Sequence, residues 1–184
     1  MLSRRGKIKL NPEFMNRYTI LIYTENFIGI LNRITIIFTR RGINIDALTA
    51  SESRLDGIHK ITIECAVTEE QIIQLVKQIE KITDVIKAYY FMDTEVVYQE
   101  IALYKLPIDS LDASLEKVIR QYNAHIIAAE KEFVVIEFTG HKEDTQALLE
   151  TLKPYNLLEF SRSGRVAIAK PRFSVSEYLN NQTL

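Results

Sequence analysis

The sequence holds one cysteine, no tryptophan and no long apolar run, and these absences exclude whole classes of protein. The single Cys65 rules out an internal disulfide and is typical of a reducing compartment, so we expect a cytoplasmic protein. No apolar segment approaches the roughly 20 residues that cross a bilayer. The basic N-terminus also lacks the apolar segment of a signal peptide. We therefore expect no membrane partner.

Charge of one sign is not in excess, and no catalytic constellation is visible. The chain has 23 basic and 24 acidic residues and a net charge of -1, so it predicts no nucleic-acid partner. It contains neither a phosphate-binding glycine loop nor a dinucleotide fingerprint. His59, His125 and His141 are scattered without metal-ligand spacing. These absences favour a binding or regulatory module over an enzyme, with no metal and no catalytic residue in this chain.

The first half of the chain alternates between strand and helix periods. Gly42 is placed to end the first helix, Asp56-Gly57 is a hairpin signal, and Thr68 with Gln71 forms a capping-box pattern. The pattern predicts strand, helix, strand, strand, helix, strand, which is the ferredoxin-like order. The predicted elements are strands at 18–24, 43–52, 58–66 and 85–91, and helices at 30–40 and after Thr68.

The second half repeats this order without the glycine turn of the first. We expect a helix that includes Leu111, a second helix after Gly140, and a final strand or hairpin across Ser163-Gly164. The fold class is therefore α+β, with two tandem ferredoxin-like (βαββαβ) domains. The expected parts are an N-terminal tail at 1–16, domains at 17–92 and 93–172, and a C-terminal tail at 173–184.

One stretch, from Glu25 to Leu48, has the features of a small ligand site. A strand leads through Gly29 into a helix whose first N–H groups lack intrahelical partners, and this end favours a carboxylate or phosphate. Asn26 and Asn44 add amide groups if the two strands are neighbours, which would suit a free amino acid. The alternative is that Gly29 and Asn26 only cap the helix.

Three runs of residues carry a resemblance to a known family. ENFIGILNRI at 25–34, followed by Phe38 and RGINIDALT at 41–49, resembles an ACT domain. Together with EFSRSGRVA at 159–167, these runs resemble the small regulatory subunit of acetohydroxyacid synthase (acetolactate synthase) over residues 18–170. Ala47 and the bulky pair Phe27-Ile28 depart from the family pattern.

The resemblance implies a non-catalytic chain that activates a large catalytic subunit and makes it sensitive to a branched-chain amino acid, most often valine. Thiamine diphosphate, a divalent metal and a flavin would then lie on the large subunit, with no cofactor in this chain. The implied effector site lies between the ACT domains of a homodimer. Its residues would be Asn26, Gly29, Ile30 and Leu31 from one chain, with Asn44 and Ile45 from the other.

Two other classes share parts of this pattern. The first is an ACT-type sensor that regulates a different biosynthetic enzyme or a transcriptional circuit, although the chain shows no helix-turn-helix segment. The second is an RNA-recognition module, which has the same strand and helix order. Such modules stack bases on aromatic residues of their central strands, and the strand predicted at 58–66 has no aromatic residue.

Overall fold

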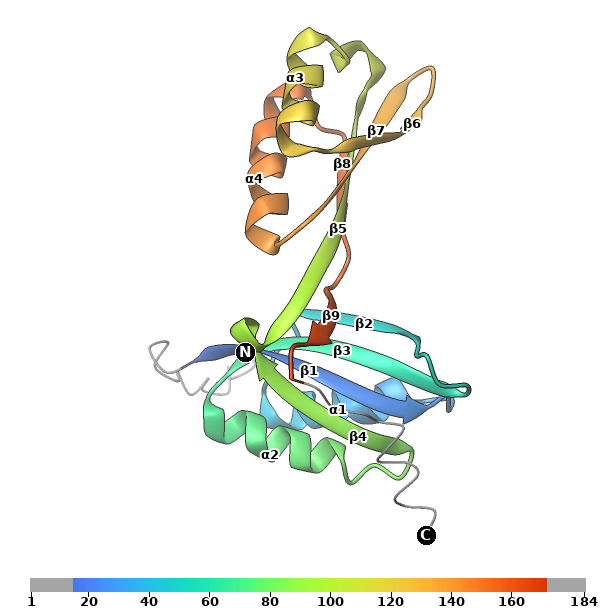
Figure 1. The fold of residues 1–184 in the computed structure, drawn as a ribbon, viewed down its shortest axis with the longest axis vertical. Helices are drawn as coiled ribbons and strands as arrows, with labels where there is room; N and C mark the ends of the chain where they lie inside the picture. Colours follow the sequence, from blue (N-terminus) through green and yellow to red (C-terminus); the bar gives the residue numbers. More distant parts are fainter. Residues whose placement is uncertain (1–14, 172–184) are drawn as a thin grey trace, which may run out of the picture.

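The computed structural model describes residues 15–171 and consists of two lobes joined end to end (Figure 1). The predicted C-terminal tail lies outside the described residues. The predicted N-terminal tail does so as well, except for residues 15 and 16, because the first strand begins at Asn16. The mixed α+β class with two βαββαβ units is confirmed.

The first lobe is a four-stranded antiparallel sheet in the order β2-β3-β1-β4, with both helices on one face (Figure 1). Its elements are β1 (Asn16–Glu25), α1 (Ile30–Arg41), β2 (Ala47–Glu52), β3 (Ile58–Val67), α2 (Glu69–Ile79) and β4 (Val85–Met92).

The helix ends follow the sequence signals. Gly42 ends α1 in the left-handed region at φ 65°, where glycine has no Cβ to clash. The capping box at α2 is present, since Thr68 and Gln71 each accept a hydrogen bond from the other's backbone N–H. Apolar residues from α1, α2 and the inner sheet face form one core, which includes Ile22, Ile34 and Phe38.

The second strand is shorter than predicted. Ile43 and Ile45 alternate as in a strand and pack against the core of the first lobe, but β2 begins only at Ala47. The preceding residues connect α1 to the sheet, and the N–H of Asp46 donates to the carbonyl of Glu64 at 2.8 Å. The alternation of Ile43 and Ile45 therefore reflects packing of their side chains against the core, and not pairing in a strand.

The second lobe repeats the topology with strand order β6-β7-β5-β8. Asp112 caps α3 by accepting from the N–H groups of Ser114 and Leu115, so Leu111 precedes this helix and the predicted start was too early. The elements are β5 (Val96–Pro107), α3 (Ala113–Tyr122), β6 (His125–Ala129), β7 (Phe133–Gly140), α4 (Lys142–Leu152), β8 (Glu159–Arg162) and β9 (Val166–Ala169).

The long strand β5 joins the two lobes. Its second half pairs with β7 and β8 in the second lobe, while its first half pairs with β9 through Val96↔Ala169 and Gln99↔Val166. Both β8 and β9 run antiparallel to β5, one after the other and not paired to each other. Of the two predicted alternatives across Ser163-Gly164, the final strand is therefore confirmed and the hairpin is wrong. Val96, Tyr98 and Ala167 from this segment pack on the outer face of the first lobe's sheet.

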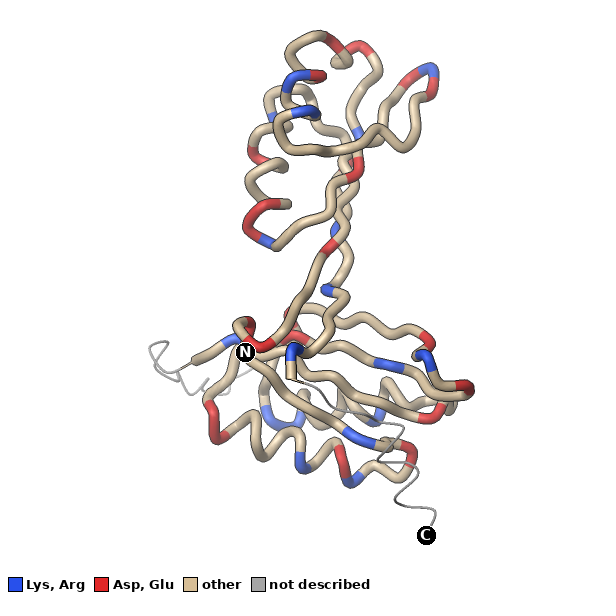
Figure 2. The backbone as a smooth tube through the Cα atoms, viewed as in Figure 1, with Lys and Arg blue, Asp and Glu red and all other residues tan. Residues whose placement is uncertain are grey.

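Acidic and basic residues are spread over both lobes, as Figure 2 shows, in keeping with the balanced composition. Within residues 15–171 no helix is long and apolar enough to span a bilayer. Cys65 is fully buried in the first core, as expected for a small apolar side chain.

Candidate functional site

A cavity of about 170 Å³ lies between the start of α1 and the strands beneath it. Helix residues form one side of the cavity, and residues from β1, β2 and β3 form the other. Its lining residues are Thr24, Asn26, Phe27, Gly29, Ile30, Leu31, Ala50, His59 and Ile61.

The helix side of this cavity offers free backbone donors. Gly29 precedes the helix at φ 85°, and no side chain from the described residues caps it. The N–H of Ile30 donates to the carbonyl of Phe27 at 3.2 Å. The N–H groups of Leu31 and Asn32 belong to the first turn and have no partner within the helix. This end of the cavity therefore suits an anionic group such as a carboxylate.

The strand side of the cavity combines one polar corner with an apolar wall. Thr24 on β1 pairs with His59 on β3, and two positions further along β3 Ile61 faces the same way, opposite Ala50 of β2. Thr24 is completely buried, and its hydroxyl finds no hydrogen-bond partner among the described residues. Ile61 and Ala50 present only hydrocarbon. A ligand here would meet polar and apolar surfaces on different sides.

Four of the six predicted site residues line this cavity, namely Asn26, Gly29, Ile30 and Leu31. Asn44 is exposed and Ile45 packs against the core of its own lobe, so neither reaches the cavity of the same chain. The sequence interpretation had placed these two on a partner chain, and that assignment stays a prediction.

Sequence reasoning missed the cavity residues that come from the sheet. Thr24, His59 and Ile61 were assigned to strands, but their shared face under α1 depends on the register between β1 and β3. Strand alternation could have found Thr24, because it lies an even number of residues from the buried Ile20 and Ile22 and so faces the same side of the sheet.

Apolar side chains are exposed around the mouth of the cavity. Phe27 is 57% exposed, Ile28 is 100% exposed and Leu31 is 40% exposed. Phe27 and Leu31 are also among the residues that line the cavity. An exposed apolar cluster beside a ligand-sized cavity is typical of a surface that a partner or ligand covers.

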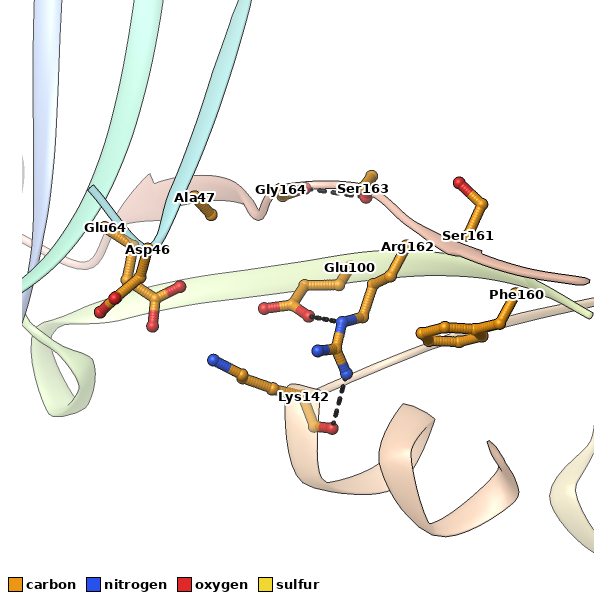
Figure 3. Close-up of a pocket in the computed structure, with 10 residues that line it drawn as sticks. All are labelled: Asp46, Ala47, Glu64, Glu100, Lys142, Phe160, Ser161, Arg162, Ser163 and Gly164. Atoms are coloured by element: carbon orange, nitrogen blue, oxygen red, sulfur yellow. Dashed lines mark hydrogen bonds and ion pairs between the residues drawn. The ribbon is translucent and has the colours of Figure 1, made fainter. Parts of the chain in front are cut away.

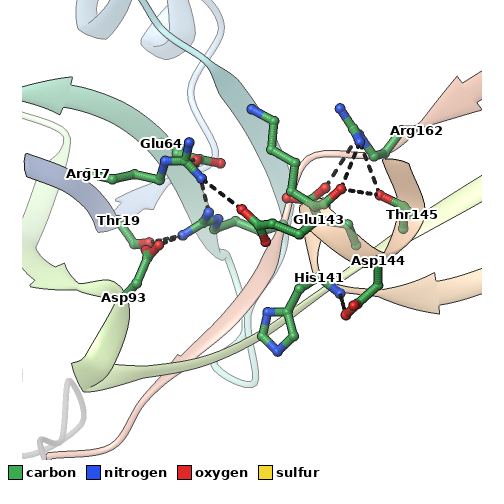
Figure 4. A network of polar contacts seen from close by, with 12 residues as sticks. Arg17, Thr19, Glu64, Asp93, His141, Glu143, Asp144, Thr145 and Arg162 are labelled. Carbon is green, nitrogen blue, oxygen red and sulfur yellow. Dashed lines mark hydrogen bonds and ion pairs between the residues drawn. The ribbon is translucent and has the colours of Figure 1, made fainter. Parts of the chain in front are cut away.

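The second feature of the molecule is a buried charge cluster where the lobes meet, shown in Figure 4. Arg165, from the segment between β8 and β9, is 1% exposed and lies 2.9 Å from a carboxylate oxygen of Glu64 on β3. It also lies 2.7 Å from Asp93 and donates to the hydroxyl of Thr19 at 2.9 Å. Arg17 is a second cation at 3.3 Å from Glu64.

An aromatic ring and a buried carboxyl complete this cluster. The Arg165 guanidinium lies over the ring of Tyr98, 3.9 Å from its centroid, which is a cation–π contact. Burial raises the pKa of the Glu64 carboxyl above its usual value, although Arg165 and Arg17 act in the opposite direction. The cluster thus joins β1 and β3 of the first lobe to the strand pair that leads into the second.

A polar cavity of about 450 Å³ lies beside this cluster, between the lobes (Figure 3). Asp46 and Glu64 reach it from the first lobe, and Lys142 and Arg162 reach it from the second. Arg162 lies 3.5 Å from the buried Glu100, so these charges are partly compensated. Residues 15–171 bring together no group of three side chains that could hold a metal ion.

Gly164 allows the lobes to approach each other closely at this point. A Cβ on this residue would lie 2.5 Å from the Thr49 hydroxyl oxygen and 3.3 Å from the Leu48 carbonyl. Any side chain at this position, between β8 and β9, would therefore require Thr49 of β2 to shift. The glycine of the run at 159–167 has a structural role that its sequence context did not reveal.

Comparison with known proteins agrees with both halves of this architecture. Residues 20–87 match the family model described as an AHAS small subunit-like ACT domain, and residues 99–171 match the model described as the small subunit of acetolactate synthase. The acetolactate synthase small subunit of Bacillus subtilis is 33% identical over 153 residues, which cover 82% of this chain and 89% of the relative.

More distant relatives cover still more of the chain. The acetolactate synthase small subunit of Aquifex aeolicus is 28% identical over 179 residues, covering 96% of this chain and 89% of the relative. The crystal structure of the small subunit from Thermotoga maritima superposes with a TM-score of 0.78 at 25% identity, covering 86% of this chain and 99% of that one. The chain therefore belongs to the acetolactate synthase small subunit family, and its first lobe is an ACT domain.

Proposed function

We propose that this chain is a non-catalytic regulatory subunit that binds the large subunit of acetolactate synthase, activates it and confers feedback inhibition by valine. The observation that carries this proposal is the cavity at the start of α1, in a chain whose family is that of the small subunit. The cavity offers free N–H groups at one end and hydrocarbon walls at the other. Those are the two surfaces that a branched-chain amino acid requires.

The polar and apolar surfaces of the cavity match the polar and apolar groups of an amino acid. The carboxylate would accept from the N–H groups of Leu31 and Asn32 at the helix start. The ammonium would meet amide oxygen from Asn26. The branched side chain would pack on Ile61 and Ala50, where burying each methylene-sized group contributes about 0.8 kcal/mol.

A homodimer would complete the site. The ACT sheet ends at β2, which has a partner strand on one side only, and such an edge is a common place for two copies to meet. The exposed Phe27 and Ile28 add apolar surface beside the cavity. A second chain on this surface would bring its Asn44 and Ile45 toward the effector, as the family resemblance implies.

The two strands beneath the cavity, β1 and β3, could also couple effector binding to the contacts that hold the second lobe. On β1, Thr24 lies at the cavity and Thr19 at the Arg165 cluster. On β3, His59 lies at the cavity and Glu64 at the Arg165 cluster. At ~3.3 Å per residue, these ends are roughly 16 Å apart. An effector that favours one position of these strands would change how the second lobe is held. Allosteric couplings of this kind are typically ~1–3 kcal/mol.

The catalytic partner would hold the cofactors. Thiamine diphosphate, a divalent metal and a flavin would lie on the large subunit, as the family resemblance implies. This chain would contribute contacts that shift the large subunit between states. Such a shift requires that the effector bind one state of the complex better than the other.

Isothermal titration calorimetry tests this proposal. The purified full-length chain would be titrated with valine, leucine and isoleucine, first alone and then in complex with its large subunit. We expect saturable valine binding with one site per chain or one per two chains, and inhibition of the reconstituted enzyme over the same concentration range. Absence of binding by all three amino acids, alone and in the complex, would overturn the effector assignment.

A further inference from the structure

The hydroxyl of Thr24 is a buried polar group for which the described part of the chain supplies no partner. The residue is 0% exposed, and it is one of the residues that line the cavity at the start of α1. A buried hydroxyl without a hydrogen bond destabilises a fold, and nearly all such groups are paired in native proteins. Because Thr24 lines a ligand-sized cavity, an occupant of that cavity would supply the missing partner.

The surroundings of Thr24 determine which part of an amino acid it would meet. The free N–H groups lie on the helix side, and the hydrocarbon wall lies toward β2, at Ala50 and Ile61. Thr24 lies in the remaining corner, two residues before Asn26 on the same segment. The carboxylate and the side chain of the effector already have matching surfaces elsewhere, so the ammonium faces this corner.

We propose that Thr24 is an effector-binding residue whose hydroxyl oxygen accepts a hydrogen bond from the ammonium group of the bound amino acid. This assignment rests on the proposed function, because it requires an amino acid in the cavity. A threonine hydroxyl can accept two hydrogen bonds, and an ammonium group offers three donors. Thr24 and Asn26 would then share one ammonium, and the orphaned hydroxyl would become paired only in the bound state.

This arrangement predicts opposite effects of one substitution on folding and on binding. Thr24→Val has nearly the same shape and keeps the branched Cβ that suits a strand. It removes a buried group that is unpaired without ligand, so the free chain should be as stable as the original or more stable. The same change removes a hydrogen bond to a charged group, so valine affinity should fall about tenfold or more.

The test compares three proteins, each as the full-length chain in complex with its large subunit. They are the original chain, Thr24→Val, and the control Thr62→Val, which changes a buried threonine of β3 that does not line the cavity. Each is titrated with valine and with 3-methylbutanoate, which is valine without its amino group. Denaturant unfolding of each free chain gives the stability readout.

We expect Thr24→Val to weaken valine binding while leaving 3-methylbutanoate binding unchanged, so that the affinity ratio of the two ligands shrinks. Thr62→Val should leave that ratio as it is. If Thr24→Val binds valine as tightly as the original chain, the assignment of Thr24 is overturned while the proposed function stands. An unchanged ratio would overturn the ammonium assignment in the same way. If the original chain binds none of the branched-chain amino acids, the proposed function fails, and this inference fails with it.

Discussion

Removal of the buried guanidinium between the lobes is the perturbation with the largest expected effect on stability. Arg165→Met keeps an apolar stem of similar length but leaves Glu64, which is 1% exposed, without its 2.9 Å partner. Breaking a buried ion pair from one side costs ~3–5 kcal/mol, because a charge stays buried without compensation. The cation–π contact with Tyr98 is lost as well.

The expected magnitude lies at the lower end of that range. Arg17 remains 3.3 Å from Glu64, and its half-exposed side chain can still screen the carboxylate. We therefore expect Arg165→Met to lower the free energy of unfolding by about 3 kcal/mol. Adding Glu64→Gln removes the uncompensated charge, so the double variant should recover at least about half of the loss.

Urea unfolding followed by circular dichroism measures both variants. The matched control is Arg120→Met, the same substitution in an exposed pair with Glu116, where the arginine side chain is 82% exposed. Exposed pairs of this kind contribute little, so the control should change stability by less than about 0.5 kcal/mol. A loss below about 1 kcal/mol for Arg165→Met, or no recovery in the double variant, would refute a coupled buried cluster.

Two further predictions follow from the glycine between the lobes and from the buried thiol. Gly164→Ala would place a Cβ 2.5 Å from the Thr49 hydroxyl oxygen, so we expect the free energy of unfolding in urea to fall by ~1–3 kcal/mol. Adding Thr49→Ala should recover part of this loss. A Gly164→Ala variant as stable as the original chain would contradict the close approach. Burial, with the Asp46 and Glu64 carboxylates nearby, raises the pKa of the Cys65 thiol from 9.0 to about 12. Because the folded thiol holds its proton more tightly than the unfolded one, its contribution to stability is complete below pH 9 and is lost as the pH rises toward 12. At pH 9 a thiol reagent should therefore modify Cys65 only as fast as the chain unfolds, and rapid labelling of the native protein would contradict this burial.

Much of the fold could be predicted from the sequence because local signals and the global topology agree. Gly42 ends α1 and the pair Thr68 and Gln71 begins α2, as their local chemistry requires. The start of α1 just after Gly29 could be predicted for the same reason, whereas its anion-binding role stays a prediction. These features depend on residues close together in the chain, where spacing alone fixes geometry.

The remaining features depend on contacts between distant residues. The pairing of β9 with the start of β5, and the burial of Arg165 against Glu64, join positions far apart in the chain. An arginine in a run of polar residues gives no sign that it will be buried. The strand side of the cavity at the start of α1 likewise depends on the register that pairs Thr24 with His59.

In the proposed function, the cavity at the start of α1 holds the carboxylate of a feedback effector. Gly29→Asp tests this assignment, since within residues 15–171 no atom beyond the local backbone lies within 4 Å of a Cβ built at this residue. The new carboxylate would repel that of valine. Gly29→Asn is the control, because both residues tolerate the left-handed backbone at φ 85° while only one carries charge. In the enzyme reconstituted with its large subunit, we predict that Gly29→Asp abolishes valine inhibition and keeps activation, whereas Gly29→Asn keeps more of the inhibition. A Gly29→Asp enzyme that remains fully sensitive to valine would show that this cavity does not hold the effector's carboxylate.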